Sequence, residues 1–412
     1  MHFVIVSYTF PPSREIGGRR WGKFSIYLCK EGHSVTVVCA GNKTDKDFYE
    51  KNYPGIEIIT LPKNYPEFLK GYTKNIIEKI LYFIMTRIIS PTIKYNIFDW
   101  GLFWKKQLLN TLKVIHKKQK IDVLIITGAP FSLLYYGTFF KRKHKDIFYV
   151  IDLRDPWTNG ENYGFKTMDS KKRDLQEFQE KNSVQYADLV CVPVDVMKKY
   201  FVEKYPEYSQ KIYLLPHAYE PNNFDLKSNP EIKNRFIYGG ALYDGIQEEF
   251  FKVINVIEKF APQDFKWEIY SNTINKILEN KKNYQKVEIH SFIPEKELFY
   301  KIASSKAYLM IYPESDKDFI STKFFEIIYA KTPVIFIGKK GEISEFIKQN
   351  KLGVHISPEN IENELPAYLS GDLKFEGHSF DINQYSFSKV TRRFLEKIDS
   401  IRQNSNIIHL NY

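Results

Sequence analysis

Side chains suited to carbohydrate chemistry are concentrated in the stretch Asp-Leu-Arg-Asp-Pro-Trp at residues 152–157, directly after a short apolar run. Asp152 and Asp155 could accept hydrogen bonds from sugar hydroxyls, and the indole of Trp157 could stack on a pyranose ring. The bland alternative is that Asp152 or Arg154 only steadies a loop through an Asp–Arg pair. Taken together, the group favours sugar binding.

A second candidate cluster begins a helix expected after residue 321. Ser321 or Thr322 has the residue type of an N-cap, and Lys323 and Glu326 are spaced to share one helical face. Lys323 falls in the first turn, where a positive charge opposes the helix dipole. An anion beside it would remove the conflict, whereas an ordinary surface Lys–Glu pair is the alternative.

A third candidate is Gly17-Gly18, in a loop that leads from the first apolar run into a helix. Free amides at a helix N-terminus bind phosphate, and glycine lets the backbone approach a ligand closely. A flexible surface loop is the alternative. The sequence lacks the Gly-x-Gly-x-x-Gly pattern of dinucleotide-binding proteins.

The elements that must position these residues alternate along the chain between short apolar runs and helix-length amphipathic segments, which predicts parallel β-sheets with helical crossovers. The fold class is therefore α/β, with two Rossmann-like doubly wound domains. The first series of predicted strands covers residues 3–6, 35–39, 56–61, 123–126, 147–151, 189–192 and 212–215, and the second covers 236–238, 267–270, 287–290, 307–311, 334–337 and 354–356.

Proline-rich residues 205–234 are the expected hinge between the domains. We expect an N-terminal domain over 1–210, a C-terminal domain over 211–386, and a final helix over 387–412 that packs back on the first domain. Residues 64–120 interrupt the alternation with lysines, arginine and aromatic residues. This insertion suits an anionic membrane interface, or else it is a helical pair that caps the sheet edge.

Composition excludes several classes of protein. The 412 residues are 43% hydrophobic and 26% charged, as in a globular chain, and the three cysteines, Cys29, Cys39 and Cys191, support neither a disulfide framework nor a zinc knuckle. The start of the chain lacks a signal-peptide pattern, and no apolar run is long enough for a membrane span. We therefore expect a cytoplasmic protein, peripheral at most on the inner face of the plasma membrane.

The net charge of +11 favours an anionic partner. Nucleic-acid-binding motifs are missing from the sequence, so we expect no nucleic acid partner. Asp316 and Asp318 superficially match an Asp-x-Asp metal motif, but their position before a helix of the second domain argues against a metal. The histidines are scattered, so we expect neither a metal nor a cofactor.

Several motifs in order resemble the retaining glycosyltransferases of family 4, of the bacterial surface-polysaccharide type. They are Gly17-Gly18, residues 152–157, the turn at 238–243, the stretch 292–298, and Lys323-x-x-Glu326 followed by Pro333. The resemblance covers nearly the whole chain. It implies two facing domains in the GT-B arrangement with a cleft between them, a nucleotide sugar bound mainly by the second domain, an acceptor bound mainly by the first, and no obligatory metal.

The resemblance also implies a role for each residue. Glu326 would accept hydrogen bonds from both ribose hydroxyls, and Asp318 would bind hydroxyls of the donor sugar. Lys323 would lie beside the diphosphate. Asp152 and Asp155 would position the acceptor and the reacting sugar, with Arg154 among the catalytic residues. The remaining donor-binding candidates are Gly17, Gly18, Gly240, Pro294, Phe319, Ile320, Ser321 and Thr322, and the remaining acceptor-binding candidates are Arg19, Arg20 and Trp157.

Two departures from the family pattern stand out. Asp318 is one methylene shorter than the usual glutamate, which could mark a different donor sugar. The arginine and lysine that many members carry after the first strand of the second domain are missing from residues 241–246. A departing nucleoside diphosphate needs positioned cations or amides, and the candidates to replace the pair are Arg19, Arg20, Arg154 and Lys323.

The expected function is metal-independent, retaining transfer of a sugar from a nucleoside-diphosphate sugar, UDP by family frequency, to a saccharide hydroxyl. The basic insertion points to a lipid-linked acceptor at the membrane, as in surface-polysaccharide synthesis. A nucleotide-sugar epimerase of the same fold and a non-catalytic GT-B scaffold are the alternatives.

Overall fold

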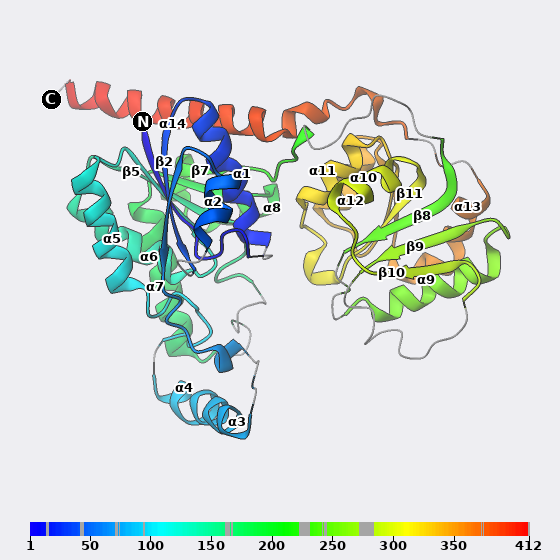
Figure 1. Ribbon diagram of the computed structural model, residues 1–412, viewed down its shortest axis with the longest axis horizontal. Helices are drawn as coiled ribbons and strands as arrows, with labels where there is room; N and C mark the ends of the chain where they lie inside the picture. The colour runs from blue at the N-terminus through cyan, green and yellow to red at the C-terminus, as the bar shows by residue number, and fades with distance from the viewer. Residues whose placement is uncertain are drawn as a thin grey trace. The chain divides into compact units, whose positions relative to one another are not determined.

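The computed structural model describes residues 1–13, 16–41, 45–70, 73, 75–93, 95–160, 165, 168–221, 231–240, 242, 245–271, 284–371, 373 and 375–410. It divides into two compact units (Figure 1). Unit 1 consists of Met1–Pro216 with Val390–Tyr412, and unit 2 of His217–Lys389. The sequence expectation placed these divisions at residues 210/211 and 386/387.

Unit 1 is built on a parallel seven-stranded sheet in the order β3-β2-β1-β4-β5-β6-β7. Five of its strands are buried at nearly every position, because helices cover both faces of a parallel sheet. The runs of consecutive apolar residues that were predicted to be strands do form strands. The strands are β1 (His2–Val6), β2 (Ser34–Ala40), β3 (Ile56–Leu61), β4 (Val123–Gly128), β5 (Phe148–Leu153), β6 (Leu189–Val192) and β7 (Ile212–Leu214).

The helices of unit 1 pack their apolar stripes on this sheet. In α1, the side chains of Trp21, Phe24 and Leu28 are fully buried at helical spacing. The other helices are α2 (Lys46–Asn52), α5 (Lys105–Lys118), α6 (Ser132–Lys143), α7 (Ser170–Tyr186) and α8 (Asp195–Lys204), and α1 spans Ile16–Lys30.

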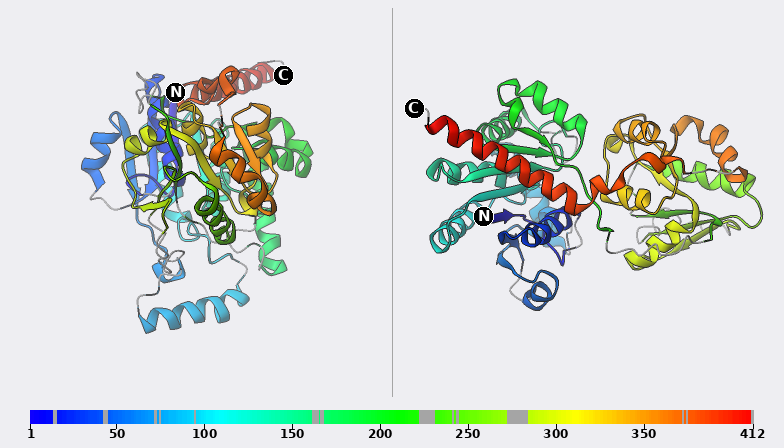
Figure 2. Two further views of the ribbon diagram at one scale, coloured as in Figure 1. Left: turned by 90° about the vertical axis from the view of Figure 1, so that its right-hand side faces the viewer. Right: turned by 90° about the horizontal axis from the view of Figure 1, so that it is seen from above.

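The last helix, α14 (Phe387–Leu410), belongs to unit 1 from Val390 onward. Figure 2 shows it running past the N-terminus. Phe394 packs edge-on against Trp21 with ring centroids 6.1 Å apart, and Arg392 pairs at 2.8 Å with Glu31, the residue directly after α1. The C-terminal helix is thus packed on the first domain's α1.

The insertion forms its own small helical structure in unit 1. A short helix η2 (Glu67–Lys70) precedes a continuous helical segment composed of α3 (Ile76–Phe83), the π-helical η3 (Ile84–Ile89) and α4 (Ser90–Thr92). Tyr65, Leu69 and Ile97 form a small buried cluster beneath this segment. Figure 1 shows α3 and α4 well away from the sheet of unit 1.

Unit 2 is built on a parallel six-stranded sheet in the order β10-β9-β8-β11-β12-β13. Its strands are β8 (Lys233–Gly239), β9 (Lys266–Tyr270), β10 (Val287–His290), β11 (Ser305–Ile311), β12 (Val334–Ile337) and β13 (Gly353–Ile356). Its helices are α9 (Gln247–Phe260), α10 (Glu295–Ala303), α11 (Thr322–Tyr329), α12 (Glu342–Gln349) and α13 (Ile361–Ser370).

Each sheet has one point at which the direction of winding reverses. In unit 1 it lies between β1 and β4, and in unit 2 between β8 and β11. In open α/β sheets, ligands bind outside the carboxyl ends of the strands at this point. Loops that leave the ends of β1, β4, β8 and β11 are therefore the places to look for a site.

Candidate functional site

Asp152, at the carboxyl end of β5, is fully buried and forms three hydrogen bonds. Trp21 Nε1 donates to one carboxylate oxygen at 2.7 Å, as does Thr127 Oγ1 at 3.0 Å, and Arg20 donates to the other oxygen at 3.3 Å. The donors come from α1 and β4. A buried carboxylate is tolerated only when its charge and lone pairs are satisfied in this way.

Arg20 is buried as well, and its guanidinium also donates to the carbonyl oxygens of Leu215 at 2.6 Å and Pro216 at 3.0 Å. The pair therefore joins α1 to β5 and to the segment after β7. Asp152 and Arg20, which were expected near the acceptor, are thus both buried and bonded to other parts of unit 1 in this structure. Their neighbour Arg19 is exposed on α1.

Arg154 lies over the first turn of α1. Its Nε donates to the carbonyl oxygen of Gly128 at 2.9 Å and is 3.2 Å from a carboxylate oxygen of Asp155. A Cβ atom on Gly17 would lie 1.0 Å from Nη1 of Arg154, so the guanidinium occupies the space that the glycine leaves. A cation and the positive end of a helix dipole are thus adjacent, an arrangement that favours a bound anion.

Gly18 has a different packing role. A Cβ atom there would approach the Cα and N atoms of Phe10 to 2.7 and 2.8 Å, so glycine is needed for the loop after β1 to fold over the helix start. Gly17 and Gly18 are both buried. The lack of side chains at Gly17 and Gly18 therefore lets Arg154 and the loop after β1 pack closely on α1. A flexible surface loop, the alternative, would not require this close packing.

Trp157 does not present its indole to solvent. The ring is 2% exposed, stacks on Phe131 with centroids 5.1 Å apart, and donates from Nε1 to Gln176 at 2.9 Å. The indole that was expected to stack on an acceptor sugar is therefore packed inside unit 1 in this structure. Asp155 keeps 31% of its side chain exposed beside Arg154.

The loop that carries Asp155 is anchored by hydrogen bonds to a buried acidic residue, Glu180 of α7. Thr158 donates to Glu180 from both its backbone nitrogen and its hydroxyl, Lys204 donates at 2.7 Å, and Tyr205 at 2.8 Å. Burial and the charge of Glu180 raise the pKa of the Tyr205 hydroxyl. This network was missed by sequence reasoning because its members are far apart in the chain.

In unit 2, Lys323 reaches from the first turn of α11 to the end of β8. Its ammonium group donates to the carbonyl oxygen of Gly239, the last residue of β8. Tyr308 of β11 donates to the same oxygen at 2.8 Å, and its hydroxyl accepts from the Gly239 amide at 3.0 Å. Burial raises the pKa of Tyr308 well above its usual value, so the hydroxyl stays neutral. Lys323 is thereby positioned at the reversal point of the second sheet.

Glu326 lies one turn along α11, half-buried, on the same face as Lys323. The helix starts where predicted, since the Ser321 side chain caps it by accepting from the Phe324 amide, and Thr322 is its first residue. Upstream, Ile320 is buried, and the ring of Phe319 contacts His217 edge-on at 5.7 Å.

Asp318 points to the start of α12. One of its carboxylate oxygens accepts from the Glu342 amide at 2.8 Å and would lie 2.6 Å from a Cβ atom on Gly341. The residue expected to hold the donor sugar thus caps a helix with one oxygen. Among the described residues, no group of three or more His, Cys, Asp or Glu is arranged to hold a metal ion.

Of the other donor-binding candidates, Gly240 lies beside Lys323, and Pro294 begins a different helix. A Cβ atom on Gly240 would lie 3.1 Å from Nζ of Lys323, so this glycine borders the ammonium group. Pro294 is the exposed N-cap residue of α10. Residues 241 and 243 of the expected turn lie outside the described residues.

Asp99 is a buried acidic residue that the sequence patterns did not single out. It is buried and accepts from the amide and hydroxyl of Ser132 at 2.9 and 2.7 Å, and from the Gly101 amide at 2.9 Å. Burial raises its pKa. The carboxylate joins the insertion to the start of α6, close to the carboxyl end of β4.

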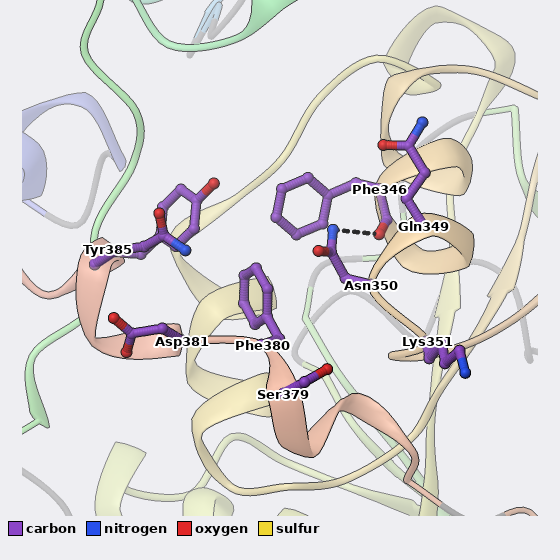
Figure 3. A pocket seen from close by; sticks show the side chains of 9 residues that line it. Phe346, Gln349, Asn350, Lys351, Ser379, Phe380, Asp381 and Tyr385 are labelled. Atoms are coloured by element: carbon purple, nitrogen blue, oxygen red, sulfur yellow. Dashed lines mark hydrogen bonds between the residues drawn. The ribbon is translucent and has the colours of Figure 1, made fainter.

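A pocket of about 510 Å³ in unit 2 lies away from these residues (Figure 3). Phe346, Gln349 and Asn350, at the carboxyl end of α12, line it together with Phe380 and Tyr385. Asp318 caps the opposite end of the same helix. The pocket is therefore separate from the site at the strand ends.

No family model matches the chain, and no curated protein matches its sequence. Solved structures do match over nearly its full length. A glycosyltransferase from Rickettsia africae is 16% identical, with a TM-score of 0.63, covering 98% of this chain and 99% of that one. Anabaena HepE in complex with UDP is 11% identical, with a TM-score of 0.59, covering 97% and 100%. The lipopolysaccharide outer core galactosyltransferase WaaB is 12% identical, with a TM-score of 0.59, covering 97% and 99%.

At these identities the likeness is one of fold. The chain has the GT-B glycosyltransferase fold with two Rossmann-like domains, as the sequence predicted.

Proposed function

We propose that this protein is a retaining glycosyltransferase that transfers a sugar from a nucleoside-diphosphate sugar, most simply a UDP-sugar, to a hydroxyl of a saccharide acceptor. The observation that carries the proposal is the position of Lys323 and Glu326. Lys323 Nζ lies at the carbonyl of Gly239, at the reversal point of the second sheet, and Glu326 follows one turn later. The complex of Anabaena HepE with UDP, on the same fold, supports a nucleotide donor.

In this proposal, unit 2 binds the donor. The ammonium of Lys323 and the amides of residues 320–322 meet the diphosphate, while Glu326 accepts hydrogen bonds from the ribose hydroxyls. The amide of Phe319 instead donates to the carbonyl oxygen of Asp316 at 2.9 Å. As the bond to the sugar breaks, negative charge grows on the diphosphate, and fixed donors stabilise that charge. The leaving phosphate itself takes the proton of the acceptor hydroxyl, so an enzyme nucleophile is not needed.

Unit 1 contributes the acceptor side. Arg154, over the start of α1, supplies a cation in this unit, and the partly exposed Asp155 beside it is the carboxylate able to meet a sugar hydroxyl. The buried pair of Asp152 and Arg20 joins β5 to α1 and so supports the position of Arg154 and Asp155. We further propose that the acceptor is lipid-linked and belongs to surface-polysaccharide synthesis, which the naming of WaaB as an outer core galactosyltransferase supports by analogy.

The test is calorimetric binding of UDP, GDP, dTDP and ADP to the wild type and to Glu326→Ala. Selective binding of one nucleotide, weakened by the substitution, is expected. Folded protein that binds none of the four would overturn the proposal in favour of a non-catalytic scaffold.

The reaction itself is tested with the UDP-sugar selected in this way. Conversion of the nucleotide sugar without acceptor would indicate an epimerase instead. A product with inverted anomeric configuration would remove the retaining part of the proposal.

A further inference from the structure

The helical segment α3–η3–α4 carries large apolar side chains into solvent. We define its outward face by six residues, and each is exposed over at least two fifths of its surface. They are Ile76 at 74%, Ile77 at 66%, Ile80 at 53%, Leu81 at 41%, Phe83 at 58% and Ile88 at 56%.

The fold of unit 1 does not use this face. Contact with the small cluster below is made by Tyr82 and Met85 on the other side of the segment. None of residues 76–92, all of which the structure describes, is buried. A helix on a protein surface normally turns polar residues toward solvent, so an outward face of isoleucine, leucine and phenylalanine indicates a partner.

The charges around the outward face indicate the nature of that partner. Lys79 and Arg87 are exposed on the same segment. Residues 67–94 contain five basic and two acidic residues, which adds a net positive charge to the apolar surface. An apolar helical face bordered by lysine and arginine matches a bilayer with anionic headgroups.

We propose that the outward face docks on an anionic phospholipid bilayer, with the segment lying in the plane of the interface. Isoleucine, leucine and phenylalanine side chains enter the boundary between headgroups and acyl chains, and Lys79 and Arg87 meet lipid phosphates. Residues 76–92 would extend roughly 25 Å as a helix, which is short of a membrane span. No helix among the described residues is long and apolar enough to cross a membrane.

A second copy of the chain fits the outward face less well. A stable protein interface usually draws about 20–30 residues from each partner. Here six apolar side chains stand on one narrow segment that Figure 2 shows apart from the rest of unit 1. A bilayer needs no complementary shape, so a narrow, convex apolar segment suffices.

Docking would bring unit 1, proposed to bind the acceptor, to the membrane surface. This link to a lipid-linked acceptor rests on the proposed function. The docking itself depends only on the side chains of the segment, and vesicle binding tests it without any reaction.

The experiment is co-sedimentation of the full-length protein with phosphatidylcholine vesicles and with vesicles that also contain phosphatidylglycerol. Binding to the anionic vesicles is expected, weakening as salt rises. The double variant Ile80→Glu, Phe83→Glu is expected to lose at least about tenfold in vesicle binding, because two charges would have to enter the apolar boundary. A second double variant, Lys79→Glu, Arg87→Glu, is expected to bind anionic vesicles less strongly relative to neutral ones. The expected reduction of this ratio is about fivefold or more for each substituted residue.

The control is Val114→Glu, which places one glutamate on α5 of unit 1 at a valine that is 68% exposed but lies outside the segment. It is expected to bind vesicles as the wild type does. UDP binding and the thermal midpoint are measured for every variant, so loss of docking is distinguished from unfolding and from failure of the proposed function.

Wild-type protein that binds neither vesicle would overturn the docking proposal and leave nucleotide binding unaffected. Equal losses from Val114→Glu and the double variant would also overturn it. If light scattering shows a wild-type dimer that the double variant dissociates, without vesicle binding, the outward face is a contact between copies instead.

Discussion

The guanidinium of Arg154 lies where a side chain on residue 17 would begin. A Cβ atom on Gly17 would be 1.0 Å from Nη1 of Arg154, whereas one on Gly18 would meet the backbone of Phe10 at 2.7 Å. The two glycines are adjacent in sequence, yet one makes room for a flexible cation and the other for fixed backbone.

Substitution of the two glycines is therefore expected to have different effects. Gly17→Ala should displace Arg154 with little loss of stability, because the end of an arginine side chain can move, and it should reduce sugar transfer at least tenfold. Gly18→Ala should destabilise the fold by about 1–3 kcal/mol, since backbone cannot yield so easily. Urea denaturation and transfer rates measure both effects. Equal stability losses for the two variants would contradict this distinction.

Removal of the charge of Lys323 is expected to weaken binding of phosphate rather than of the nucleoside. Lys323→Met should lower UDP affinity by about 10- to 100-fold, because it deletes a charge-assisted contact, while uridine affinity stays the same. Calorimetry with UDP and uridine measures the difference. An equal loss for both ligands would mean that Lys323 supports the fold of the site instead.

Asp152 is expected to be essential for stability. Asp152→Ala would leave Arg20, the Trp21 indole and the Thr127 hydroxyl buried without their shared acceptor, at a cost of about 3–5 kcal/mol. As a control, Asp146→Ala removes the exposed ion pair with Lys120, 2.9 Å long, and should leave the unfolding midpoint almost unchanged. If the Asp152→Ala protein were as stable as the wild type but slower in sugar transfer, Asp152 would instead take part directly in the reaction.

Asp99 is expected to make stability depend on pH. Burial raises its pKa in the folded protein, so between its ordinary value near 3.8 and the raised value the folded state keeps a proton that the unfolded state has lost. The contribution of Asp99 to the free energy of unfolding therefore falls as pH rises through that window, and it is constant above the window. Because asparagine does not titrate there, the stability difference between the wild type and Asp99→Asn should shrink with rising pH.

Urea denaturation of both proteins from pH 4 to pH 8 measures this trend. A constant difference across the range would show that the Asp99 carboxyl titrates with the same pKa in both states.

Much of the fold was readable from the sequence, because the strands of doubly covered parallel sheets are continuous apolar runs. Residues 123–126 and 334–337, for example, were predicted as strands and lie within β4 and at β12. The position of Lys323 also followed from local signals, since Ser321 has the residue type of a helix cap and the apolar run of β11 precedes it.

The roles of the acidic and aromatic residues after β5 were decided by the tertiary structure alone. Asp152 and Asp155 are three positions apart and chemically alike, yet only Asp152 meets Trp21 and Thr127, which are 131 and 25 positions away. Trp157 likewise stacks on Phe131 instead of facing solvent. Local patterns specify which segments become strands and helices, whereas the partner of a buried polar group is set by which distant elements the fold brings against it.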